Sequence, residues 1–156
     1  MDKEIDGKQL GYLNQEMQGL TRIYKRYEFV DCIYFVPYDC GNSTLLLLNV
    51  IVQENEKASD AFNKDIEMRN ALYNSHERID RFGGRIFIES CSAKDYRSEN
   101  VNIDKVRELL SASILYDSED GYYSKIANQF DDQLPEDKKP VKPYSNVLSI
   151  KIGNNK

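Results

Sequence analysis

The chain has 156 residues and a mass of 18.1 kDa, which is the usual size of one domain. It carries 21 Lys and Arg against 26 Asp and Glu, and the net charge of −5 argues against binding nucleic acid or anionic membranes through summed positive charge. The longest apolar run, 45–52 with one asparagine, falls well short of the roughly 20 residues that a membrane-spanning helix needs. The charged N-terminal stretch 1–9 has no apolar core, so we expect no signal peptide and a cytoplasmic protein.

Cysteine, histidine and glycine form no recognisable metal, nucleophile or phosphate-binding motif. Cys32 and Cys91 lie in apolar stretches and are expected in the core, whereas Cys40 lies in a turn. His76, the only histidine, falls in a charged helical stretch. A chain of this length can bury its own core without a metal staple. We therefore expect a domain that folds without a metal or a cofactor.

The first third of the chain predicts a helix followed by two strands. Apolar side chains at three- and four-residue spacing predict a helix over 8–27. The β-branched and aromatic run 30–36 predicts a strand that ends at Pro37, and 38–43 has the composition of a turn. The run 44–52 is apolar at both alternating sets of positions, which is typical of a strand covered on both faces.

The middle of the chain predicts a long helix and a third strand. Apolar positions at helical spacing span 59–81, and Gly83 and Gly84 mark its end. The run 85–91 has the composition of a strand. We expect the core of the sheet to contain Ile33, Phe35, Leu46, Leu48, Val50, Val52, Ile86 and Ile88.

Two further helices are expected before the tail. A polar loop over 93–100 leads to Asn102, a suitable N-cap for a helix whose apolar positions run from Ile103 to Ile114. A short segment, 115–117, then connects to a fourth helix that carries Tyr122, Ile126 and Phe130.

The predicted element order is α-β-β-α-β-α-α, followed by a tail. This order predicts an α/β or α+β domain over 1–134 with a small mixed β-sheet flanked by helices. The Pro- and Lys-containing segment 135–156 reads as an extended tail, with a candidate edge strand at 147–152.

Three segments between Leu10 and Phe130 resemble a known family. Residues 35–41 read FVPYDCG, 47–52 read LLNVIV and 114–121 read ILYDSEDG. With the element order, they resemble the nucleotidyltransferase-like domain of the DNA-polymerase-β-like superfamily, which includes antibiotic adenylyltransferases and small bacterial antitoxin-type nucleotidyltransferases. In that family the first strand ends in F-G-S-x-A-R-G, the second bears D-x-D, and a Leu-Tyr-Asp turn often follows the last core helix.

The resemblance implies a degenerate member that lacks the metal-binding carboxylates. The two family aspartates would bridge two divalent cations, but their positions are Leu47 and Asn49 here. The carboxylate of the third strand is replaced by Phe87, with Glu89 two residues further along the same face. Leucine cannot ligate a cation, and asparagine supplies one oxygen without charge. The resemblance therefore implies a pseudoenzyme without a bound metal.

The phosphate-binding part of the resembled site is altered as well. Where the family has a Gly-Ser pair that lets backbone amides approach a triphosphate, this chain has Val36 and Pro37, and proline has no N–H to donate. The resemblance places ligand contacts at Tyr38, Gly41, Asn42, Ser43 and Asn49.

The main functional hypothesis is a non-catalytic nucleotidyltransferase-like protein that binds a nucleotide-like ligand or a protein partner, with a homodimer as one form of partner. A divergent nucleotidyltransferase with a displaced acidic site is the first alternative. That site would use Asp39, Asp31 and Glu89 near the strand ends, with Asp39 and Glu89 as the candidate catalytic residues. Strand carboxylates need an exposed face or a cationic partner such as Arg85.

The second alternative is a small interaction protein of a mobile element with an unrelated α/β fold. Eleven tyrosines without a tryptophan would suit an interface of that kind.

Overall fold

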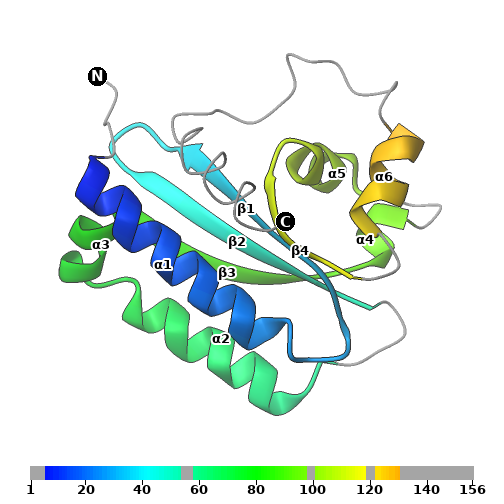
Figure 1. Cartoon of the computed structure of the whole chain (residues 1–156), viewed down its shortest axis with the longest axis horizontal. Coiled ribbons are helices and arrows are strands. Elements are labelled where there is room, and N and C mark those ends of the chain that lie inside the picture. Colours follow the sequence, from blue (N-terminus) through cyan, green and yellow to red (C-terminus); the bar gives the residue numbers. More distant parts are fainter. Residues whose placement is uncertain (1–5, 54–57, 98–100, 119–121, 131–156) are drawn as a thin grey trace.

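The protein folds as a four-stranded mixed sheet with helices on both faces (Figure 1). The computed structural model describes residues 6–53, 58–97, 101–118 and 122–130. The elements are α1 (Gly7–Tyr24), β1 (Val30–Asp39), β2 (Thr44–Val52), α2 (Asp60–Leu72), α3 (His76–Phe82), β3 (Arg85–Ser92), α4 (Lys94–Arg97), α5 (Ile103–Leu110), β4 (Ser113–Asp117) and α6 (Tyr122–Phe130). The expected α/β class is confirmed.

The strand order is β3-β2-β1-β4, so the two longest strands occupy the centre. β1 and β2 form an antiparallel hairpin, in which Tyr34 lies opposite Asn49. β3 follows β2 through the α2–α3 crossover and runs parallel to it, with Asn49 opposite Glu89. β4 adds antiparallel to the other side of β1.

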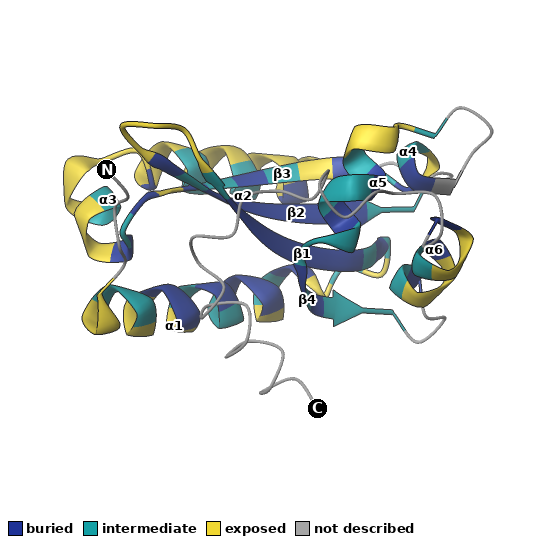
Figure 2. Cartoon of the chain, turned by 90° about the horizontal axis from the view of Figure 1, so that it is seen from above, coloured by how far each residue is buried: buried dark blue, intermediate teal, exposed yellow. Residues whose placement is uncertain are grey.

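Each face of the sheet has its own apolar core. Helices α1, α2 and α3 cover one face, and α4, α5 and α6 cover the other (Figure 1). Figure 2 shows the central strands buried between these two layers. The first core contains Leu13, Met17, Leu20, Tyr24, Ile33, Phe35, Leu46, Leu48, Val50, Phe62, Ile86 and Ile88. The second contains Cys32, Tyr34, Val36, Leu47, Ile51, Cys91, Tyr96, Val106, Leu109, Tyr122 and Ile126.

The predicted core of the sheet is confirmed at seven of its eight positions. Ile33, Phe35, Leu46, Leu48, Val50, Ile86 and Ile88 are all buried against α1 and its neighbours. Val52, at the end of β2, packs against this core but is only partly buried. Cys32 and Cys91 are buried and Cys40 is exposed, as expected, and all three are free thiols.

The prediction that Pro37 ends the first strand is wrong. β1 continues to Asp39, and Pro37 lies opposite Leu46 of β2. The pairing of β1 with β4 reaches only from Cys32 to Phe35, so β1 has a single neighbouring strand at Pro37. A proline at such a position need not supply a ladder hydrogen bond on its second side.

The single helix predicted over 59–81 is divided into α2 and α3. Tyr73 caps the end of α2, and the Ser75 hydroxyl accepts a hydrogen bond from the Arg78 amide to start α3. An N-cap side chain in the middle of an apolar helical pattern can begin a new helix in this way. α3 ends as predicted at Gly83, which adopts the left-handed conformation with φ 79°.

The helix that Asn102 caps is shorter than predicted. The Asn102 side chain accepts hydrogen bonds from the Asp104 and Lys105 amides, which confirms the N-cap. The helix ends at Leu110, and Ile114 belongs to β4. The expected polar loop 93–100 contains the short helix α4. The tail predicted over 135–156, with its edge strand at 147–152, lies outside the described residues.

Leu48→Ala tests the assignment of β2 as a strand buried on both faces. Leu48 is fully buried, so its truncation should lower the free energy of unfolding by about 2–5 kcal/mol in urea titrations. The matched control is Leu72→Ala, because Leu72 is half exposed on α2, and a change within about 0.5 kcal/mol is expected there. Equal effects of the two substitutions would contradict the assignment.

Gly84→Ala tests the close approach of the α3–β3 turn to the sheet. A Cβ at Gly84 would lie 2.8 Å from the Thr44 carbonyl oxygen and 3.1 Å from a carbon of the Leu46 side chain, so the variant should melt at a lower temperature. Gly19→Ala, in the middle of α1 with no neighbour within 4 Å of the new Cβ, should instead stabilise by about 0.5–1 kcal/mol. An unchanged melting temperature for Gly84→Ala would contradict the contact.

Candidate functional site

A polar cluster lies on the sheet face that α4, α5 and α6 cover. Leu47, Asn49, Phe87 and Glu89 point to this face, and the parallel pairing of β2 with β3 places Leu47 opposite Phe87 and Asn49 opposite Glu89. These are the four positions that the resemblance to nucleotidyltransferases assigns to the carboxylate region. The sheet therefore brings together residues that are separated by about 40 positions in the sequence.

Asn49, at the centre of the cluster, is fully buried. Its amide nitrogen donates to the Oε1 atoms of Glu89, at 3.5 Å, and of Glu108, at 3.3 Å. Lys105 Nζ lies 3.0 Å from Glu89 Oε1 and 3.9 Å from Glu108 Oε1. One amide and one ammonium therefore bridge two carboxylates, one from β3 and one from α5.

Three tyrosines extend the cluster across the sheet. The Tyr34 hydroxyl donates to Glu108 Oε1 at 2.6 Å and lies 2.9 Å from the Tyr96 hydroxyl. The Tyr38 hydroxyl donates to the other oxygen of Glu108. Glu108 thus accepts hydrogen bonds at both oxygens, from β1 and β2. This set, Tyr34, Tyr38, Asn49, Glu89, Tyr96, Lys105 and Glu108, is called the Glu108 cluster below.

Burial and the carboxylates shape the ionisation of the cluster. Burial raises the pKa of Tyr34 well above its ordinary value, and nearby Tyr96 and Glu108 raise it further. Burial alone would lower the pKa of Lys105, but its hydrogen bond to Glu89 and the nearby acidic groups raise it above the ordinary value. At neutral pH the tyrosines are therefore neutral donors and Lys105 is a cation.

The residues present do not fit the two divalent cations that the resembled family holds. Leu47 has no ligand atom, and Asn49 turns its amide N–H₂, not its oxygen, toward the two carboxylates. The ammonium of Lys105 lies against Glu89 where a cation would have to approach. No three His, Cys, Asp or Glu side chains gather as metal ligands in the described part of the chain.

The structure divides the candidate residues of the sequence into two groups. Tyr38, Asn49 and Glu89 belong to the Glu108 cluster. The other four lie at the exposed turn between β1 and β2: the Asp39 carboxylate accepts from the Gly41 amide at 3.0 Å, and Asn42 and Ser43 follow in the same turn. Asn49 is five residues along β2 from Thr44, or about 17 Å, so the turn lies away from the Asn49 amide, and Tyr38 on β1 is the cluster residue next to the turn.

The displaced acidic site does not assemble from the residues first considered. Asp31 and Asp39 lie near opposite ends of β1, about 26 Å apart at the usual rise per residue. Arg85 lies over the ring of Phe87, 5.4 Å from its centroid, and the cationic partner of Glu89 is Lys105 instead. Glu89 shares its partners Asn49 and Lys105 with Glu108, which the sequence does not mark as a neighbour.

Four residues of the Glu108 cluster carry no signal in the sequence patterns that marked the other three: Tyr34, Tyr96, Lys105 and Glu108. Lys105 and Glu108 are spaced i,i+3 on α5 and flank its apolar positions Val106 and Leu109. This pairing of opposite charges beside an apolar stripe is a detectable signal, but it is also common on solvated helices. What distinguishes this pair is the buried Asn49 on the facing strand.

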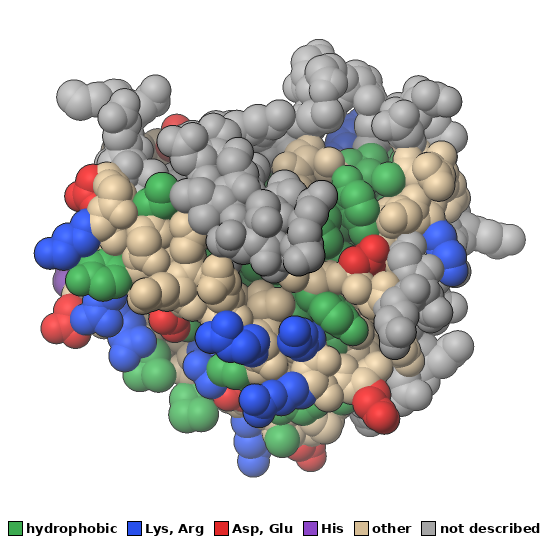
Figure 3. Space-filling view, in the orientation of Figure 1, with side chains coloured by type: hydrophobic (Ala, Val, Ile, Leu, Met, Phe, Trp, Pro, Cys, Tyr) green, Lys and Arg blue, Asp and Glu red, His purple; other side chains and the backbone are tan. Residues whose placement is uncertain are grey.

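Surface features elsewhere on the described residues are shallower. Figure 3 shows Lys and Arg side chains gathered over α1 and α2, and Arg22, Lys25 and Arg26 are exposed at the end of α1, as a solvated helix face predicts. Met68 and Leu72, one turn apart on α2, are the most exposed large apolar side chains of the described part.

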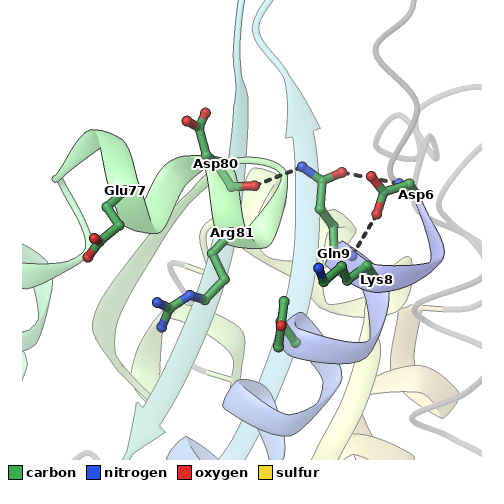
Figure 4. A pocket seen from close by; sticks show the side chains of 7 residues that line it. Asp6, Lys8, Gln9, Glu77, Asp80 and Arg81 are labelled. Atoms are coloured by element: carbon green, nitrogen blue, oxygen red, sulfur yellow. Dashed lines mark hydrogen bonds between the residues drawn. The ribbon is translucent and has the colours of Figure 1, made fainter.

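An open hollow of about 360 Å³ lies between the start of α1 and α3 (Figure 4). Some of its polar groups pair with one another. The Asp6 carboxylate accepts from the Gln9 amide, the Gln9 side chain donates to the Asp80 carbonyl at 2.8 Å, and Arg81 lies over the ring of Tyr12. The charged side chains of Lys8, Glu77 and Asp80 also line this open hollow.

Comparison of the chain with protein-family models, with curated proteins and with solved structures gives no match. Within the described residues, no helix has both the length and the apolar character needed to cross a membrane.

Alkaline unfolding tests the buried tyrosines of the cluster. The raised pKa of Tyr34 means that the folded state keeps this proton above about pH 10, where an unfolded tyrosine loses it. The contribution of protonated Tyr34 to stability is complete below about pH 10 and is lost as pH rises through the pKa of the folded state. Over that range the free energy of unfolding falls by at most about 1.4 kcal/mol per pH unit because of this group. Urea titrations from pH 8 to 11 should show a smaller slope for Tyr34→Phe than for Tyr12→Phe, whose ring is exposed. Equal slopes would contradict the prediction.

Proposed function

We propose that this protein is a non-catalytic member of the nucleotidyltransferase-like class that acts by binding a protein partner. The observation that carries the proposal is the burial of the sheet surface at the positions where the resembled family binds its substrate. This buried surface is called the sheet floor below. Val36, Leu47 and Asn49 are 1%, 5% and 0% exposed, and Glu89 is already paired with Lys105.

The filled floor favours a protein partner over a nucleotide. A triphosphate needs exposed hydrogen-bond donors or cations at the strand ends. Phosphoryl transfer also needs donors or cations that stabilise the negative charge developing on the transferred group. Pro37 supplies no N–H, and the one ammonium of the cluster is used internally. A protein partner can bind the outer surface of the domain without using the sheet floor. The exposed apolar side chains of Met68 and Leu72 on α2 are suited to such a contact.

Nucleotide titration tests the non-catalytic part of the proposal. With Mg²⁺ or Mn²⁺ and ATP, GTP, CTP or UTP, calorimetry should give no heat of binding, and a pyrophosphate assay should give no release. Glu89→Gln is the control, because Glu89 is the exposed carboxylate of the cluster. Turnover in the parent that is lost in Glu89→Gln would overturn the proposal in favour of a divergent nucleotidyltransferase.

A second copy of the chain is the first partner to examine. Sedimentation over a wide concentration range would detect a dimer, and a variant with Met68→Ser and Leu72→Ser would show whether α2 forms the contact. Both side chains are at least half exposed, so their replacement should not unfold the domain.

A further inference from the structure

Two carboxylates face one small space in the Glu108 cluster. The Asn49 amide nitrogen and Lys105 Nζ each lie near the Oε1 atoms of both Glu89 and Glu108. The Glu108 side chain is only 11% exposed, so water screens its charge poorly. Like charges at this proximity in a partly buried site are unfavourable unless a cation lies between them.

Lys105 supplies that cation. It is the one residue in the described ranges whose positive charge is in ion-pair contact with Glu89 or Glu108. It reaches them from α5, the same helix that carries Glu108. The two carboxylates and one ammonium leave the group with a charge of −1, and removal of the ammonium would leave −2.

Asn49 contributes an unused oxygen at the same place. Its Oδ1 is fully buried and has no hydrogen-bond partner among the described residues, while its nitrogen faces the carboxylates. A buried polar atom without a partner costs about 1–3 kcal/mol. The amide can present its oxygen to the cluster instead by a half-turn of the terminal group, since the two ends have nearly the same shape. Two carboxylates and one amide oxygen are ligands that hard divalent cations prefer.

We propose that Lys105 acts as a covalently attached cation of this cluster, filling the place between Glu89 and Glu108 that a divalent cation takes once the ammonium is removed. The ammonium nitrogen lies 3.0 Å from Glu89 Oε1 and 3.9 Å from Glu108 Oε1. A divalent cation needs about 2.0–2.6 Å, so the Glu89 oxygen has to close in by roughly 0.4–1 Å and the Glu108 oxygen by roughly 1.3–1.9 Å. This inference goes beyond the proposed function and does not depend on any partner.

Lys105→Met removes the ammonium and keeps an unbranched side chain. Calorimetry and electron paramagnetic resonance with Mn²⁺, in the absence of nucleotide, should detect one bound ion in this variant with at least tenfold higher affinity than in the parent. Mn²⁺ should also raise the melting temperature of the variant and not that of the parent. Lys105→Arg is the matched control, because it keeps the charge and should behave as the parent does.

The added substitution Glu108→Gln tests the location of the ion. The double variant Lys105→Met/Glu108→Gln should lose the gain in Mn²⁺ affinity by tenfold or more. Lys105→Gln, which retains a hydrogen-bond donor toward Glu89, serves as the second variant if Lys105→Met does not fold without metal. Folding of either variant on addition of Mn²⁺ supports the inference.

Three results would overturn the inference: a folded Lys105 variant that binds Mn²⁺ no better than the parent, a gain in affinity that survives Glu108→Gln, or failure of both variants to fold with or without Mn²⁺. The readout contains no nucleotide and no partner. A failure here is therefore distinguishable from a failure of the proposed function.

Discussion

The burial of β1 and β2 on both faces is the constraint from which the rest of the structure follows. The two strands form the centre of the sheet, and helices cover each side of it. Apolar side chains meet this constraint at nearly every position of β2. The exceptions are Thr44, at the start of the strand, and Asn49, whose amide has to find partners inside the second core because no solvent reaches it. The Glu108 cluster meets that requirement for the amide nitrogen, whereas the amide oxygen has no hydrogen-bond partner among the described residues.

The cluster connects the sheet to α5 through charge as well as apolar contact. Val106 and Leu109 pack into the second core, while Lys105 and Glu108 on the same helix pair with groups from β1, β2 and β3. The charged members of such a network depend on one another, because loss of one partner leaves the other charge buried and unpaired in surroundings of low dielectric constant. The hydrogen bonds and ion pairs of Lys105 and Glu108 therefore restrict where α5 can lie on the sheet more than apolar packing alone would.

The functional proposals rest on the same arrangement. The positions that resemble the carboxylate region of nucleotidyltransferases, Leu47, Asn49, Phe87 and Glu89, lie on one face as two adjacent pairs. Their side chains, with Lys105, favour an internally ion-paired cluster over a metal-dependent site. The resemblance itself stays a prediction, and the functional proposal draws its support from the burial and ion pairing of these residues.

Local sequence patterns determined β1, β2 and β3, the caps at Asn102 and Gly83 and most of the apolar core, but not β4, whose residues they predicted as the end of a helix and a connecting segment. Alternation and β-branching predicted 44–52 as a strand covered on both faces, and the Asn102 and Gly83 signals marked real helix boundaries, because propensity and capping depend on neighbours in the chain. Only the tertiary structure decided that β1 could continue through Pro37, since this depends on how far β4 pairs with it. It also decided that Lys105 and Glu108 meet Asn49 and Glu89. That contact depends on strand register and on the docking of α5, which no local pattern specifies.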